Sequence, residues 1–174
     1  MIDQQTKSKQ FKRIAAACGL SGAIAASSLL LPFEGTVNKV YLDPVQILTS
    51  CTGHTGKELQ LGQTFTDEQC TDQLIKDIQV HDQQLMSVVT VKMNDYEHAA
   101  YLSFVFNVGI DNFRKSTMLG KLNAGNHAGA CAEFIRWSYA GKQQLQGLVR
   151  RRVAETDMCL GKTNIDKALL DEIK

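Results

Sequence analysis

The chain has 174 residues, which is enough for one well-packed domain and short for two. Hydrophobic residues make up 44% of the sequence and charged residues 21%, an ordinary globular composition that excludes disordered, collagen-like and coiled-coil architectures for most of the chain. The 19 Lys and Arg residues nearly balance the 18 Asp and Glu residues. The net charge of +1 therefore gives no electrostatic reason to expect nucleic acid as a partner.

The charge is unevenly distributed at the amino terminus. Residues 1–13 carry four basic side chains and Asp3, a local charge of +3, whereas residues 14–33 carry no charge. An uncharged run of 20 residues is long enough to span a bilayer as a helix, and a basic flank keeps its start in the cytoplasm. Six Ala, two Gly and three Ser make the run only weakly hydrophobic, so we expect its insertion to be marginal and reversible.

Three interpretations of residues 14–33 remain open at this point. The run is a weak signal anchor, a secretory signal peptide with a cleavage site at residues 23–25, or a buried helix of the soluble domain. The first is favoured, and the first two both export the domain that follows. We therefore divide the chain into a basic cytoplasmic flank at 1–13, a signal-anchor segment at 14–33 and a folded domain at 34–174.

The five cysteines agree with export to an oxidising compartment. Cys18 lies inside the apolar run and is the natural odd thiol. The other four, Cys51, Cys70, Cys131 and Cys159, allow three pairings, of which 51 with 70 and 131 with 159 close the shortest loops. The alternative is that all five are small buried apolar side chains.

The pattern after residue 33 predicts a small antiparallel sheet followed by helices. Residues 37–49 alternate β-branched, aromatic and polar side chains around an Asp-Pro pair, and residues 52–62 are rich in Gly. Thr66 and Gln69 form a capping-box signature for a helix that runs to about residue 89, and residues 94–108 carry the apolar face of a central buried helix. Shorter helices are expected at 116–123, 127–139 and 147–160. The fold class is therefore α+β, with a small sheet lobe before a larger helical lobe.

Carboxylates are the candidate catalytic groups. The sequence has no glycine-rich phosphate loop, no CxxC pair, no G-x-S-x-G elbow and no HExxH arrangement, so we expect neither a metal nor a cofactor. Glu34 directly follows the apolar run, and apolar neighbours favour the protonated acid that glycosidic bond cleavage requires. Asp43 follows nine residues later and Thr49 six after that, so a hairpin would bring both back toward Glu34. The structural alternatives are a solvated helix end for Glu34 and an ordinary turn residue for Asp43.

The spacing Glu-x8-Asp-x5-Thr, formed by Glu34, Asp43 and Thr49, resembles the catalytic signature of phage-type lysozymes, glycoside hydrolase family 24. Further segments resemble the family in the same order, namely residues 53–56, 62–66, 103–109, 113–117, 121–125, 136–139 and 147–155. The amino-terminal run is similar to that of the signal-anchor-release endolysins of this family. The resemblance implies a lysozyme-like fold with an amino-terminal apolar helix.

The resemblance also implies an endolysin that hydrolyses the β-1,4 bond between N-acetylmuramic acid and N-acetylglucosamine in peptidoglycan and so lyses the bacterial host cell. Glu34 would be the general acid, and Asp43 and Thr49 would position and activate the attacking water. Phe106 and Ser116 match positions that line the substrate cleft in the family, although core packing and a helix N-cap explain them equally well. The alternatives are a lytic transglycosylase, against which the presence of Asp43 and Thr49 argues, and a non-catalytic wall-binding relic of the fold.

The resemblance implies a monomer that binds peptidoglycan and is anchored in the inner membrane through residues 14–33, facing the periplasm. Releasing the anchor carries a net charge of +3 outward against an inside-negative potential, about 7 kcal/mol per 100 mV. We therefore expect an inert tethered enzyme that collapse of the potential releases into the periplasm. A second hypothesis is that the freed Cys18 thiol exchanges with a disulfide at Cys51.

Three smaller expectations concern single positions. Gln46 stands where the family has Gly, which puts the local turn in doubt. His54 is expected to be a structural, hydrogen-bonding histidine. Within the basic run at 150–152, Arg151 or Arg152 is expected to tie the helical lobe together, and the rest to form a solvated helix face.

Overall fold

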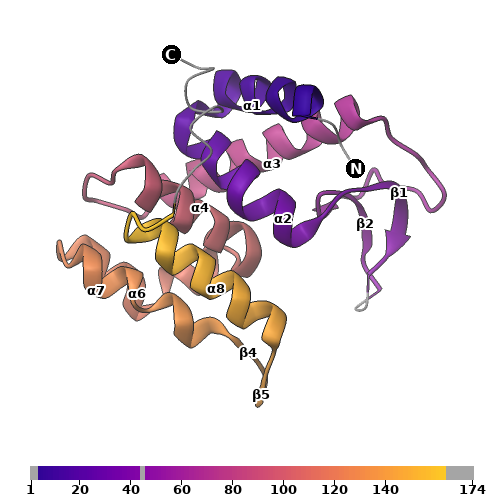
Figure 1. Ribbon diagram of the computed structural model, residues 1–174. Coiled ribbons are helices and arrows are strands. Elements are labelled where there is room, and N and C mark those ends of the chain that lie inside the picture. The colour runs from indigo at the N-terminus through magenta and orange to yellow at the C-terminus, as the bar shows by residue number, and fades with distance from the viewer. Residues whose placement is uncertain (1–3, 44–45, 164–174) are drawn as a thin grey trace.

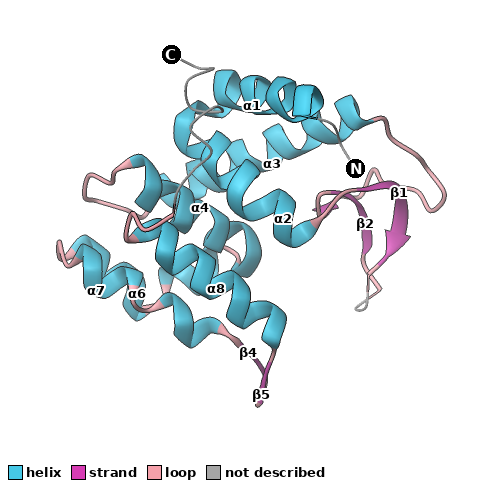
Figure 2. Cartoon of the chain, viewed as in Figure 1, coloured by secondary structure: helices cyan, strands magenta, loops and turns pink. Residues whose placement is uncertain are grey.

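The computed structural model describes residues 4–43 and 46–163, and it confirms an α+β fold with a small sheet lobe and a larger helical lobe (Figures 1 and 2). The strands are β1 (Val37–Leu42), β2 (Leu48–Cys51), β3 (His54–Thr55), β4 (Tyr139–Ala140) and β5 (Gln143–Gln144). The helices are α1 (Gln4–Ala25), a π-helical turn (Ala26–Leu30), α2 (Leu31–Glu34), α3 (Asp67–Met86), α4 (Asp95–Val108), α5 (Ile110–Arg114), α6 (Thr117–Asn123), α7 (His127–Cys131), a 3-10 turn (Phe134–Trp137) and α8 (Gln146–Cys159).

The amino-terminal apolar run is helical and packs into the core of the helical lobe. Figure 1 shows α1 lying along α3 and leading through α2 into the sheet. Ile14, Ile24 and Leu30 are each at most 1% exposed. The helix of residues 5–34 is also long and apolar enough to cross a membrane by length and composition alone. Because lipid and a protein core are both apolar surroundings, this packing leaves the division of the chain at residue 33 a prediction.

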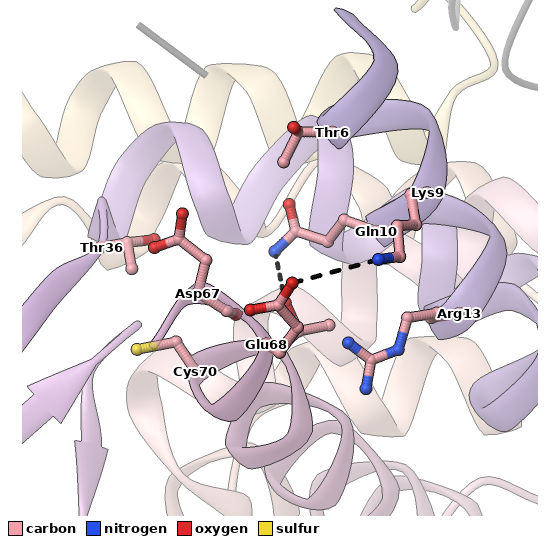
Figure 3. A pocket seen from close by; sticks show the side chains of 9 residues that line it. Thr6, Lys9, Gln10, Arg13, Thr36, Asp67, Glu68 and Cys70 are labelled. Carbon is pink, nitrogen blue, oxygen red and sulfur yellow. Dashed lines mark hydrogen bonds and ion pairs between the residues drawn. The ribbon is translucent and has the colours of Figure 1, made fainter. Parts of the chain in front are cut away.

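Polar contacts join the basic flank to the start of α3. The Gln10 amide donates to the Thr71 hydroxyl over 3.2 Å, and the Arg13 guanidinium donates to the Asp72 carboxylate over 2.5 Å. Figure 3 shows Lys9 and Gln10 facing Glu68 across a pocket of about 40 Å³, which has room for water but not for a sugar. The flank that the sequence assigns to the cytoplasm therefore packs in the fold against oppositely charged and polar side chains at the start of α3.

The sheet has the predicted hairpin. Its strand order is β1-β2-β3, all antiparallel, with Tyr41 opposite Thr49 and Thr49 opposite Thr55. Asp43 and Gln46 lie in the turn between β1 and β2, where the Gln46 amide donates to the Asp43 carbonyl over 2.9 Å. Pro44 lies outside the described residues. The hairpin returns the chain toward the start of β1, which directly follows α2.

Most predicted helices are confirmed and one is wrong. The capping box at Thr66 and Gln69 is present, and α4, α6 and α8 begin and end within a residue or two of expectation. The single helix expected at 127–139 is instead α7, a 3-10 turn and the first strand of a small hairpin. The break follows from tertiary contacts: Phe134 is buried against two core rings, and Glu133 accepts hydrogen bonds from Thr117, Lys121 and Arg136. The short helix α5 was not predicted.

Two disulfides have the pairing that closes the shortest loops. Cys51–Cys70 joins β2 to α3, and Cys131–Cys159 joins α7 to α8. The alternative of five buried thiols is therefore wrong. Cys18 is not in a disulfide, and its sulfur lies 3.7 Å from the Ile75 carbonyl oxygen on α3. Exchange between Cys18 and Cys51 stays a prediction.

Candidate active site

Glu34 is the last residue of α2 and lies between the helical lobe and the sheet lobe. Gly35 ends the helix because its φ of +70° is a backbone conformation that residues with a side chain rarely adopt. The Glu34 carboxylate forms an ion pair with Arg151 of α8, and its side chain is 25% exposed. On the other side, a Cβ placed at Gly53 would lie 3.6 Å from Glu34 Oε2. The turn after β2 therefore closes on the carboxylate.

A buried network of charges lies behind Glu34. Arg151 Nε donates to Glu155 Oε1 over 3.2 Å, and the Ser103 hydroxyl of α4 donates to the same oxygen over 2.9 Å. The guanidinium of Arg152 pairs with the other oxygen, Oε2. Burial raises the pKa of Glu155, and the two guanidiniums oppose that effect. The ion pair to Glu34 is thus held from behind by a fully buried carboxylate.

Arg152 ties α8 to the rest of the helical lobe, as expected for one of the two arginines. Its Nε donates to the Trp137 carbonyl over 3.2 Å, and its guanidinium lies 4.8 Å from the centroid of the Phe104 ring. A further hydrogen bond joins it to the Asn107 side chain. Burial lowers the pKa of Arg152, while its pairing with Glu155 favours the charged form.

Asp43 and Thr49 are held by the hairpin between β1 and β2. The Ile47 amide donates to Asp43 Oδ1 over 2.8 Å, and the Thr49 hydroxyl donates to the Ile47 carbonyl over 3.1 Å. Thr49 is only 5% exposed. Gln46 has a φ of +66°, so the left-handed turn that Gly would favour is present with a side chain in its place. The replacement of Gly by Gln at position 46 therefore leaves the turn of the hairpin intact.

The two candidate cleft residues have structural partners. The ring of Phe106 packs on His81 with centroids 4.7 Å apart. Ser116 is the N-cap of α6, where its hydroxyl accepts from the Leu119 amide over 3.1 Å and donates to the Phe113 carbonyl over 2.7 Å. The structural roles are therefore confirmed: Phe106 packs against a neighbouring ring, and Ser116 caps α6. Substrate binding by either residue stays a prediction.

A hollow of about 520 Å³ opens on the α8 side of the Glu34–Arg151 pair. Phe33, Leu148, the exposed Arg150 and Arg151 are among the residues that line it. Its size is that of a site for a small ligand. The arrangement places an apolar and cationic surface next to the candidate acid.

His54 is a structural histidine, as predicted. Its Nδ1 lies 2.9 Å from an Asp77 carboxylate oxygen, and its Nε2 lies 2.8 Å from Glu58 Oε1. Burial lowers the pKa of the imidazole, but the hydrogen bonds to Glu58 and Asp77 outweigh burial and leave that pKa raised. The residue therefore links β3 to α3 beside the turn that contacts Glu34.

Sequence reasoning missed Glu155 and Ser103. The signal that would have found Glu155 is its spacing, three residues from Arg152 and four from Arg151, which places all three on one helix face. Among residues 4–43 and 46–163, no group of three or more His, Cys, Asp or Glu side chains is placed to hold a metal ion.

Residues 32–155 match the family described as Phage lysozyme. The chain is 42% identical to the SAR-endolysin of bacteriophage PS119 over 80% of its own length and 87% of that protein. It is 41% identical to the SAR-endolysin of Enterobacteria phage PA-2 over 86% of its length and 94% of that protein. Among solved structures, the active form of the P1 phage endolysin Lyz matches with a TM-score of 0.80 at 20% identity, covering 92% and 97% of the two chains, which shows the fold alone.

Proposed function

The chain belongs to the phage lysozyme family and is an endolysin, a glycosidase that lyses peptidoglycan, and we propose that Glu34 is its general acid. The observation that carries the assignment is the position of Glu34 at the end of α2, paired with a buried arginine and facing the sheet lobe. The bond cleaved is the β-1,4 bond between N-acetylmuramic acid and N-acetylglucosamine. The carboxylic acid of Glu34 gives its proton to the glycosidic oxygen as the bond to the anomeric carbon breaks.

Asp43 and Thr49 supply the water. The Asp43 carboxylate accepts a proton from a water molecule as that water adds to the anomeric carbon, and the Thr49 hydroxyl orients the same water. The Ile47 backbone supports this assignment because it hydrogen-bonds to both side chains. The two groups are therefore oriented together by one turn before substrate arrives.

Arg151 holds Glu34 and stabilises its carboxylate once the proton has left. The hollow beside this pair supports binding of the sugar or of its peptide substituent next to the acid. Phe106 and Ser116 complete the cleft in this proposal. The outcome is a hydrolysed glycan with a free reducing end.

Replacement of Glu34 by Gln tests the assignment. The substitution keeps the shape and removes the proton donor, so we expect release of dye from labelled peptidoglycan to fall about 10²- to 10⁴-fold. Glu68→Gln, an exposed change on α3, is the matched control and keeps activity. Reducing ends among the products support hydrolysis, and 1,6-anhydro ends would mean a transglycosylase. An active Glu34→Gln variant would show that a different group donates the proton.

We further propose that residues 14–33 anchor the newly made enzyme in the inner membrane, with residues 1–13 in the cytoplasm and the domain in the periplasm. The length and apolar composition of this helix support the anchor. Because Ile14, Ile24 and Leu30 pack into the core of the fold, an anchored chain lacks those core side chains. Beyond the break at Gly19, the helical segments follow one another without a gap to Glu34 at the end of α2, so anchoring also withdraws Glu34 from Arg151. The tethered enzyme is therefore inactive and becomes active on release into the periplasm.

Fractionation of cells before and after addition of an uncoupler tests the anchor. We expect the full-length chain to move from the membrane pellet to the soluble periplasm as the potential collapses. The amino-terminal sequence of the soluble, active form separates release from cleavage. A start at Met1 or Ile2 means release, and a start near Ser27 means that the leader is cut.

A further inference from the structure

The charges behind Glu34 do not cancel. Arg151, Arg152 and Glu155 are at most 4% exposed, and together two guanidiniums and one carboxylate carry one positive charge toward Glu34. A positive group beside a carboxyl favours its ionised form. A general acid, however, must hold its proton until substrate is bound. The ion pair that positions Glu34 therefore places a positive charge beside the group that has to donate a proton.

Glu155 is placed to reduce this conflict. Each of its oxygens accepts from a different guanidinium, Oε1 from Arg151 and Oε2 from Arg152. The Ser103 hydroxyl donates to Oε1 over 2.9 Å, and the Arg151 Nη2 donates to the Ser103 carbonyl over 3.3 Å. These contacts hold the Arg151 guanidinium in place. They also put the negative charge of Glu155 next to it, which lowers the net positive charge beside Glu34.

We propose that Glu155 is a positioning residue for catalysis, which orients the Arg151 guanidinium that holds Glu34 and offsets one of the two guanidinium charges beside it. The inference rests on the proposed role of Glu34 as general acid. The neighbouring contacts from α4 are made by the Ser103 hydroxyl and the Asn107 side-chain oxygen, and the turn after β2 approaches Glu34 at Gly53. The charged or titratable groups nearby are Arg150, Arg151, Arg152 and Glu155 on α8, and Asp43 and His54 in the sheet lobe.

A pair of variants with opposite effects tests the proposal. Glu155→Gln removes one negative charge and keeps the shape, so the alkaline limb of kcat/KM against pH should move to lower pH by about one unit. Asn107→Asp adds a negative charge beside Arg152 at an exposed position, so the same limb should move to higher pH by about half a unit. The substrate is purified, dye-labelled peptidoglycan at constant ionic strength.

Glu133→Gln is the matched control. Glu133 is also buried and also pairs with two cations, Lys121 and Arg136, but it does not contact the arginines of α8. Its loss should lower the melting temperature and leave the pH limb in place. This is the result expected of any substitution that affects only the stability of the fold.

The outcomes separate the possible failures. If Glu155→Gln lowers the melting temperature without moving the limb, Glu155 is structural only and the inference is overturned. If that variant does not fold, Asn107→Asp decides, because an unmoved or acid-shifted limb overturns the inference. If Glu34→Gln itself stays active, the proposed function fails and the inference fails with it.

Discussion

Replacement of Gly19 by Ala should shift the enzyme from the released to the tethered form. In the released fold, α1 is broken at Gly19, where φ is +71° and ψ is −178°. Only Gly adopts this conformation readily, and a residue with a side chain there costs about 1–3 kcal/mol. A Cβ at this position would meet nothing within 4 Å, so the expected cost is conformational and involves no clash.

The same substitution favours the anchored state. A helix that crosses a bilayer keeps its backbone hydrogen bonds unbroken, and Ala stabilises a helix interior over Gly by about 1 kcal/mol. The two effects act in the same direction, for a combined shift of about 2–4 kcal/mol, or roughly 30- to 700-fold in the tethered-to-released ratio. We expect delayed lysis and a larger membrane-bound fraction.

The assay is the share of full-length chain in membrane and soluble fractions over time, together with the onset of lysis. Thermal unfolding of the purified, released Gly19→Ala protein measures its conformational cost separately. Gly120→Ala, an exposed change within the helix α6 with open space around it, is the control and should leave release unchanged. Equal soluble fractions and lysis times for Gly19→Ala and the natural chain would refute the reasoning.

Two further predictions concern stability. Because the pKa of His54 is raised in the fold, its contribution is complete below the ordinary value of about 6.5 and is lost as pH rises through the folded value. Urea unfolding should therefore show the unfolding free energy falling as pH rises above about 6.5. The His54→Gln variant should show a smaller fall over the same pH range. An equal fall in the variant and the natural chain would contradict the assignment. Replacing Cys131 and Cys159 together by Ser opens a loop of 28 residues and should lower the unfolding free energy by about 3–4 kcal/mol. Denaturant titration measures the loss, and a change below about 1 kcal/mol would show that the chain-entropy account does not hold here.

Local features of the chain were predictable because their causes lie within a few residues. Thr66 and Gln69 satisfy each other across one helical turn, Gly35 ends α2 through its own backbone freedom, and the Asp43 hairpin returns through a short turn. The sequence left three disulfide pairings open, and the structure has the one that closes the shortest loops. The spacing of Glu34, Asp43 and Thr49 was readable for the same reason.

Only the tertiary structure decided what surrounds these residues. Glu34 and Arg151 are 117 positions apart, so no local pattern links them, and the role of Glu155 depends on that contact. The expected helix at 127–139 broke because buried side chains outweighed helical preference. An apolar run has the same composition whether its neighbours are lipid tails or core side chains. Sequence alone therefore identified residues 14–33 as an apolar run that favours a membrane anchor, and only the fold showed which of its side chains pack in a protein core.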